Sequence, residues 1–395
     1  MLRTGLVLGL LALVGPFAID MYLPALPRIA EDFGTSETAV QMTLTGYFIA
    51  FGLAQMIYGP MADRYGRRLP ILLGLAVFTL GSLGATLAGS VESLVAWRAF
   101  QGLGGAALMV VPRAIVRDMY TGPEATKLMA MIMLVIAVSP MLAPLAGSGV
   151  IAVSGWRMVF AVLCVLAVLA LILTVTLQPE TLPAERRTPI SPRALLHGSA
   201  HLLRDGGFMG LTLIGGFGMA SFFVFIASAP FVYVTQFGLT PTGFSIAFAV
   251  NAIGFFTASQ MAGYLGEKLG MRRLVRFGIF GFSGFALALL GAALAGQATL
   301  IAIAVLLFLA NACLGVVIPT TMVLALDDHG EHAGLASSLG GTLQMLAGGL
   351  MIALAGPFFD GTALPMIGAI ALCAVIALCL TLAMLPGRIE AVQGS

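Results

Sequence analysis

The chain has 395 residues, of which 59% are hydrophobic and only 9% charged, and its mean hydropathy is +1.04. So little polar surface cannot cover a water-soluble globule of this length, and we therefore expect a protein that lies in a lipid bilayer. The net charge is only +2, and the basic residues are sorted between alternate gaps instead of pooled in one patch, which argues against nucleic acid as a partner.

Twelve apolar stretches follow one another along the chain. Each is about 20 residues long, which is enough for a helix to cross a roughly 30 Å hydrocarbon layer. The expected spans are 4–26, 39–60, 70–90, 93–117, 126–152, 156–177, 208–235, 242–265, 274–295, 299–325, 333–357 and 363–386. The sequence therefore predicts an all-α membrane protein with twelve transmembrane helices.

The basic residues mark one side of this predicted protein. If the spans alternate in direction, fifteen of the nineteen Lys and Arg residues fall on the same side: Arg3, Arg64, Arg67, Arg68, Arg117, Lys127, Arg186, Arg187, Arg193, Arg204, Lys268, Arg272, Arg273, Arg276 and Arg388. The other side has only Arg28 and Arg157. Because Lys and Arg concentrate in cytoplasmic loops, we expect both termini to be cytoplasmic.

The longest polar interval, 178–207, divides the spans into two sets of six. A decapeptide that begins at Gly59, Gly-Pro-Met-Ala-Asp-Arg-Tyr-Gly-Arg-Arg, is echoed 204 residues later from Gly263. Parallel repeats of this kind are typical of transporters in which two bundles rock about a central site. We therefore predict two pseudo-symmetric six-helix bundles, 1–177 and 208–395, joined by a cytoplasmic linker.

The repeated loop has a mechanical interpretation as a gate. Its glycines allow close helix approach, and Asp63 with the neighbouring arginines could hold two helix ends together. Asp118, which ends a span on the same side, is the expected partner. The alternative is an ordinary positively charged loop, which we favour for Arg64 or Arg68 taken alone but not for the whole repeated motif.

Asp20 is the only carboxylate well inside a predicted span. An ionisable group in hydrocarbon costs at least about 2.5 kcal/mol, so it is rarely present without a function. The alternative is a carboxylate that bends or caps the helix ahead of Pro24. Arg98 is expected at a similar depth, roughly 9 to 12 Å from the same membrane face. The alternative for Arg98 is a side chain that snorkels to the lipid headgroups.

Four stretches, 15–27, 55–68, 98–104 and 113–120, carry a resemblance to a known family. On these residues the chain resembles the major facilitator superfamily, in its twelve-span drug:proton antiporter branch, and within that branch the bicyclomycin and chloramphenicol resistance family. The stretch 139–147 is similar to the antiporter motif, but it has Ser-Pro, Ala-Pro and Gly-Ser where Gly-Pro and Gly-Gly are usual. Pro140 and Pro144 would still bend that helix.

The resemblance implies a function. Asp20 and Arg98 would face one central cavity, where Asp20 binds a proton and Arg98 helps to release it in exchange for a small drug or antibiotic. The proton gradient would be the driving force, with no cofactor, and we expect a monomer in a bacterial inner membrane. The alternative is a proton-coupled transporter of an endogenous metabolite such as an amino acid, peptide or sugar. An enzyme is disfavoured because the chain has no Walker loop, dinucleotide fingerprint or Gly-x-Ser-x-Gly elbow.

Candidate residues for the gate and for the substrate site follow from these motifs and from polar or adaptable side chains at span depth. The gating candidates are Gly59, Asp63, Arg64, Gly66, Arg67, Arg113, Arg117, Asp118, Pro140, Pro144, Gly263 and Glu267. The substrate-binding candidates are Asp20, Tyr47, Gln55, Arg98, Gln101, Met133, Met141, Phe217, Phe225, Asn251, Asn311 and Gln344.

These candidates have alternatives. Arg113 either pairs with Asp118 or Asp63 or touches the substrate. Any one polar residue of the second set is alternatively part of a hydrogen bond between helices, and any one Phe or Met alternatively packs in the bundle or faces lipid.

Two histidine pairs, His197 with His201 and His329 with His332, have spacings that a metal ion could use. Both pairs lie in predicted cytoplasmic loops. We interpret them as solvated segments and predict no metal site.

Overall fold

The computed structural model describes residues 2–120, 122–188, 191–327, 329 and 333–385. Within these residues, twelve helical segments are long and apolar enough to cross a membrane, and no strand occurs. The predicted all-α fold with twelve membrane-spanning helices is therefore confirmed.

The helices follow one another with short connections. The first half contains α1 (Leu2–Asp20), η1 (Leu23–Ala25), α2 (Leu26–Phe33), α3 (Glu37–Tyr65), α4 (Arg68–Thr86), α5 (Val91–Met119), α6 (Gly122–Ser154) and α7 (Arg157–Leu177). The connecting segment contains η2 (Ala184–Arg186) and α8 (Pro192–Arg204). The second half contains α9 (Gly206–Phe231), η3 (Val232–Gln236), α10 (Pro241–Leu269), α11 (Met271–Leu294), α12 (Leu300–Asp327), α13 (Ala333–Ala355), η5 (Gly356–Phe358) and α14 (Ala363–Met384).

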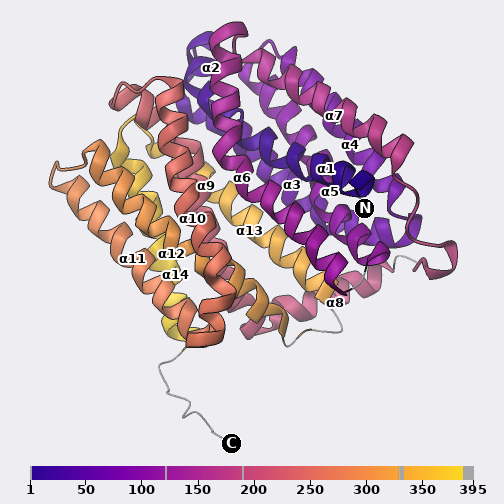
Figure 1. The fold of residues 1–395 in the computed structure, drawn as a ribbon. Coiled ribbons are helices and arrows are strands. Elements are labelled where there is room, and N and C mark those ends of the chain that lie inside the picture. The colour runs from indigo at the N-terminus through magenta and orange to yellow at the C-terminus, as the bar shows by residue number, and fades with distance from the viewer. Residues whose placement is uncertain (1, 121, 189–190, 328, 330–332, 386–395) are drawn as a thin grey trace, which may run out of the picture.

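Most helices pack within their own half (Figure 1). In the first half α5 lies against α3 and α4, α4 against α7, and α1 against α6. In the second half α12 lies against α10 and α11, and α9 lies against α13 and α14. Two pairs, α3 with α13 and α6 with α10, join the halves along their length. The division into two bundles that move as units remains a prediction.

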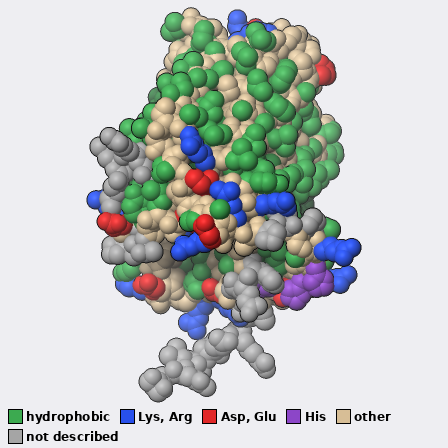
Figure 2. Space-filling model, turned by 90° about the vertical axis from the view of Figure 1, so that its right-hand side faces the viewer, with side chains coloured by type: hydrophobic (Ala, Val, Ile, Leu, Met, Phe, Trp, Pro, Cys, Tyr) green, Lys and Arg blue, Asp and Glu red, His purple; other side chains and the backbone are tan. Residues whose placement is uncertain are grey.

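Charged side chains gather toward the two ends of the molecule. Figure 2 shows hydrophobic side chains over most of the upper part of one face, while most of the charged side chains lie lower down. Most described Lys and Arg residues lie at one end of the molecule, which we call the basic end. It contains the whole of α8, the last turns of α3 and α5, and the first turn of α4. The opposite end contains α2, η3 and η5.

The first span is interrupted near its middle, which the sequence did not predict. α1 stops at Asp20, and η1 and α2 each begin with a proline in the first turn. Proline lacks an N–H and has a preset φ, so it suits the start of a new helix better than the interior of an old one. The backbone at the break lies directly against α6, because a Cβ on Gly147 would be only 2.1 Å from the Met21 carbonyl oxygen.

The bend expected in α6 does not interrupt that helix, which runs without a break through Pro140 and Pro144. The hydroxyl of Ser245 in α10 lies 2.9 Å from the Pro144 carbonyl of α6 and 2.8 Å from the Pro241 carbonyl of its own helix, and it can donate to either. This contact joins α6 to α10. It does not replace the N–H groups that the two prolines lack, because the carbonyls left without those partners belong to Ile136 and Pro140.

Side-chain hydrogen bonds join the two halves. Those that are described lie between the middle of the molecule and the end opposite the basic end. Thr38 donates to the Gly356 carbonyl at 2.7 Å, and Thr342 donates to the Gly52 carbonyl at 2.7 Å. Gln41 donates to the Ala227 carbonyl and the Ser228 hydroxyl, both at 3.3 Å. The two halves are therefore joined by polar contacts away from the basic end.

Candidate functional site

Asp20 lies at the break in the first span, as the last residue of α1. It is 5% exposed, and among the residues that the structure describes its carboxylate has no ion pair and no hydrogen bond. Neither η1 nor α2 has a side-chain cap, so Asp20 does not cap a helix, whereas the alternative of a carboxylate where the helix bends agrees with the end of α1 at Asp20. A buried carboxylate without a partner is costly, which makes Asp20 a candidate functional group.

Arg98 comes from α5 and is fully buried, so it does not snorkel to the membrane surface. Its Nη1 donates to the Ala18 carbonyl of α1 at 2.9 Å and to Oε1 of Gln101. The Gln101 amide in turn donates to the Ser82 hydroxyl of α4 at 2.7 Å. The Nε and Nη2 atoms of Arg98 have no hydrogen-bond partner among the residues that the structure describes. Arg98 thus connects α5 to the last turn of α1.

Three aromatic rings surround the Arg98 guanidinium. Its central carbon lies 4.5 Å from the ring centre of Tyr47, 4.8 Å from that of Tyr22 and 5.7 Å from that of Phe160. A cation over the face of an aromatic ring is attracted by the ring's quadrupole, more strongly when water is excluded. Tyr22 and Phe160 were not predicted from the sequence, although Tyr22 lies only two residues after Asp20.

Asp20 and Arg98 lie in the same region but do not form an ion pair within 4.0 Å. Arg98 instead binds the backbone two residues before Asp20. The Asp20 carboxylate can therefore gain or lose a proton without a salt bridge being broken, while the Arg98 charge stays fixed by its own partners.

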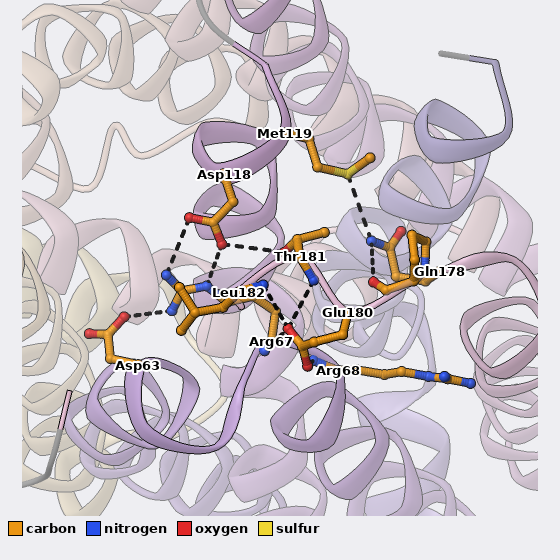
Figure 3. Close-up of polar contacts among 10 residues, drawn as sticks. Asp63, Arg67, Arg68, Asp118, Met119, Gln178, Glu180, Thr181 and Leu182 are labelled. Carbon is orange, nitrogen blue, oxygen red and sulfur yellow. Dashed lines mark hydrogen bonds and ion pairs between the residues drawn. The ribbon is translucent and has the colours of Figure 1, made fainter. Parts of the chain in front are cut away.

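At the basic end, Arg67 lies between two carboxylates (Figure 3). Its Nη1 donates to Oδ1 of Asp63 at 2.5 Å, and its Nε and Nη2 donate to the two oxygens of Asp118 at 2.7 and 3.4 Å. We call Asp63, Arg67 and Asp118 the clasp. Burial acts to lower the pKa of Arg67, but the two carboxylates outweigh burial and raise that pKa above its ordinary value. The clasp therefore holds α3, the α3–α4 turn and α5 together.

The other basic gating candidates are not part of the clasp. Arg64 lies over the ring of Tyr65, with 5.2 Å between the guanidinium carbon and the ring centre, and Arg117 is exposed. Arg113 has no ion pair with Asp63 or Asp118. Within the described part of the chain its Nε has no partner, and Arg113 lines a cavity of about 10 Å³ between α1, α5 and α6.

The second copy of the loop repeats the turn but not the clasp. Gly66 and Gly270 both end a helix with positive φ, at +90° and +81°. Within the described residues, however, Glu267 has no ion pair. The residue in the place of Arg67 is Met271, which cannot donate to a carboxylate, so the gating role of Gly263 and Glu267 remains a prediction.

Several polar substrate-binding candidates bind other helices. Asn311 donates to the side chain of Asn251 at 3.4 Å, and a Cβ on Gly341 would lie 2.7 Å from Oε1 of Gln55. A Cβ on Gly215 would lie 3.3 Å from Nε2 of Gln344. In this conformation these side chains contact neighbouring helices, which is the alternative that the sequence left open.

The apolar candidates separate into two groups. Phe225 is buried and stacks on Phe248, with ring centres 5.8 Å apart and an interplanar angle of 2°. Phe222 and Phe255 stack beside them, and neither Phe248 nor Phe255 was identified from the sequence. Met133, by contrast, is 37% exposed, while Phe217 and Met141 are half-buried.

The histidines form no described metal site. His329 lies 3.7 Å from Asp205 and packs edge-on against Phe208, and His332 lies outside the described residues. Within the part of the chain that the structure describes, no group of three His, Cys, Asp or Glu residues could hold a metal ion. His197 and His201 are exposed on α8.

Comparison with known proteins gives a consistent result. A family model described as Major Facilitator Superfamily matches residues 8–352. An uncharacterized MFS-type transporter, YdgK of Bacillus subtilis, is 35% identical over 92% of this chain and 91% of its own length. A bicyclomycin resistance protein homolog of Haemophilus influenzae is 31% identical over 94% of this chain and 93% of its own length. A crystal structure of a D-xylose–proton symporter is similar in fold, with a TM-score of 0.73 at 19% identity over 98% of both chains.

Proposed function

The chain belongs to the Major Facilitator Superfamily and is a membrane transporter, and on that premise we propose that it exports small drugs or antibiotics in exchange for protons. The similarity to a bicyclomycin resistance protein homolog supports drugs as the cargo. The buried aromatic cluster of Phe222, Phe225, Phe248 and Phe255 supports a cargo with apolar surface.

The observation that carries this proposal is the unpartnered carboxylate of Asp20 at the break in the first span. A proton bound there removes the cost of a buried charge, and a cargo that competes for the same space displaces the proton. The Arg98 guanidinium keeps its position when the proton binds and when cargo displaces it, because the guanidinium is held by the Ala18 carbonyl and the surrounding rings. Its fixed positive charge favours release of the proton.

The basic end faces the cytoplasm in this proposal, by the preference of Lys and Arg for cytoplasmic loops. The clasp then lies on the cytoplasmic side, where it stabilises one conformation of the first half. The contacts of Thr38 and Gln41 lie on the external side and hold the halves together there. In the proposed cycle these external contacts are released when the basic ends of the two halves close, so that cargo has access to one side at a time.

The test compares Asp20→Asn with Glu31→Gln in a bacterial host that lacks its own exporters. Glu31 is an exposed acid, so its variant is a matched control. We expect resistance to bicyclomycin and chloramphenicol to fall to the level of empty cells with Asp20→Asn and to persist with Glu31→Gln. Proton-driven export that survives Asp20→Asn would exclude the proposed role of Asp20.

The energy source is tested separately with the intact protein. We expect a protonophore to abolish export, whereas depletion of ATP with the proton gradient clamped leaves it unchanged. The reverse result would indicate another source of energy and would exclude proton exchange.

A further inference from the structure

The chain that leaves α7 lies against the clasp although it belongs to the segment that connects the two halves. The Glu180 carboxylate accepts four backbone N–H groups (Figure 3). Its Oε1 accepts from Arg67 at 2.8 Å and from Thr181 and Leu182 at 2.9 Å, and its Oε2 accepts from Arg68 at 3.2 Å. Two of these donors belong to the connecting segment and two to the start of α4, so one side chain fastens the two together.

The α3–α4 turn is shaped to receive this carboxylate. Gly66 has a φ of +90°, which L side chains rarely adopt, and a Cβ there would be only 2.3 Å from Oε2 of Glu180. Glycine at this position is thus needed both for the turn and for the approach of Glu180. The positive end of the α4 dipole further favours an anion here.

The connecting segment also contacts both acids of the clasp. The Thr181 hydroxyl donates to Oδ2 of Asp118 at 3.3 Å, the same oxygen that binds Nε of Arg67. Further on, the Thr188 N–H donates to the Asp63 carbonyl at 3.1 Å. Every member of the clasp is therefore in contact with the segment between Glu180 and Thr188.

The other end of the connecting segment is anchored on the second half. α8 packs against α9 and α13. Leu202 is fully buried in a small apolar cluster with Phe208, Ala336 and Leu339, and a Cβ on Gly198 would be 2.6 Å from the Leu335 side chain. The segment thus joins the clasp of the first half to helices of the second half.

We propose that Glu180, supported by Thr181, is a positioning residue through which the connecting segment holds Arg67 between Asp63 and Asp118, so that movement of the second half sets and releases the clasp. The proposal requires that the two halves move relative to each other. It does not require that protons drive the movement or that the cargo is a drug.

The contact between Glu180 and the turn responds to movement and not to ordinary changes of pH. Partial burial acts to raise the pKa of Glu180, but the four backbone N–H groups outweigh burial and hold that pKa below its ordinary value. A carboxylate with a lowered pKa stabilises the fold above its ordinary pKa, and this stabilisation is lost as the pH falls through the lowered value. At neutral pH the contact is complete.

The test measures the distance between the basic ends of the two halves by double electron–electron resonance on purified protein, without substrate or gradient. Spin labels are attached to cysteines at Lys127, in the first turn of the fifth span, and at Leu269, at the end of α10, both exposed. The background lacks the native cysteines, which are Cys164, Cys313, Cys373 and Cys379.

Glu180→Gln removes the charge and replaces one acceptor oxygen by an amide NH₂, which is a donor and cannot accept from the backbone N–H groups. Glu185→Gln is the control, because Glu185 is exposed in η2 of the same segment. We expect Glu180→Gln to lower the population at the distance seen in this structure about threefold or more, with a melting temperature close to that of the control. Equal distance distributions for the two variants would overturn the proposal, as would a lower melting temperature with an unchanged distribution.

A second variant keeps the proposal testable if Glu180→Gln folds poorly. Thr181→Val keeps the shape of the side chain and removes only the hydrogen bond to Asp118. We expect the same direction of change with a smaller amplitude, and a distribution equal to that of the unmodified protein would overturn the role of the segment. Because no cargo is present, loss of the proposed drug export would not affect this result.

Discussion

At the scale of single residues, the buried charges differ in how firmly they are held. Arg98 has a backbone carbonyl, an amide and three aromatic rings around it, whereas Asp20 has no described partner. The fixed charge is suited to setting the local field, and the unpartnered one is suited to changing its state. The rarity of a carboxylate inside a span identified Asp20 from the sequence, whereas Arg98 was identified mainly by the family resemblance of the stretch 98–104.

The rings around Arg98 could not be predicted in the same way. Tyr22 lies in the break of the first span, Tyr47 in α3 and Phe160 in α7. Tyr47 was a candidate as a polar side chain at span depth, but nothing in the local sequence of Tyr22 or Phe160 distinguishes them from aromatic residues that face lipid or pack in the bundle. Their role depends on helix packing, which hydropathy does not encode. The same limit applies to Glu180, whose value as a contact depends on a turn more than 110 residues earlier.

Tyr47 offers a test of this arrangement at the residue scale. Its hydroxyl is buried and has no partner among the described side chains and backbone groups, while its ring lies against Arg98. We expect Tyr47→Phe to leave thermal stability in detergent unchanged or up to about 1 kcal/mol higher, and Tyr47→Leu to lower it by roughly 0.5–2 kcal/mol through loss of the cation–π contact. Equal stability of the two variants would show that the ring does not hold Arg98. If Tyr47→Phe weakens drug binding at unchanged stability, the hydroxyl is a ligand contact.

At the scale of helices, the twelve spans were predictable because each needs only a window of apolar residues, and such a window averages over local detail. Because the window averages over local detail, it did not predict the break in the first span. Pro24 and Pro27 give a local signal, but the break also requires that α6 present a residue without a side chain at Gly147. That requirement links positions more than 120 residues apart.

Gly147 provides the corresponding prediction. A Cβ at this position would be 2.1 Å from the Met21 carbonyl oxygen, so Gly147→Ala must displace α1 or α6. We expect the thermal stability to fall by about 1–3 kcal/mol. Gly149→Ala, in the same helix, is the control, since a Cβ there meets nothing within 4 Å, and it should leave stability unchanged or raise it by up to about 1 kcal/mol. Comparable effects of the two variants would contradict the close contact.

At the scale of the whole molecule, the two halves share a topology but differ at the motif that their sequences repeat. The positive φ at Gly66 and Gly270 shows that the turn is retained in both. Met271 stands where the first half has the clasp arginine, and among the described residues a charged clasp is present in the first half alone. The pattern of Gly, acid and base predicted the turn correctly, but a network of three charges depends on every member, and one substitution is enough to remove it.

The contacts at the opposite end give a prediction for the movement of the halves. Thr38→Val keeps the side-chain shape but removes the bond to the Gly356 carbonyl, so the conformation in which these ends separate should become more populated. We expect a cysteine at Ala229, buried in α9, to react with a maleimide roughly three- to tenfold faster in the background without native cysteines. Thr35→Val is the control, because the described hydrogen bonds of Thr35 involve only its backbone. Equal labelling rates in the two variants would mean that the contact of Thr38 does not hold the halves together.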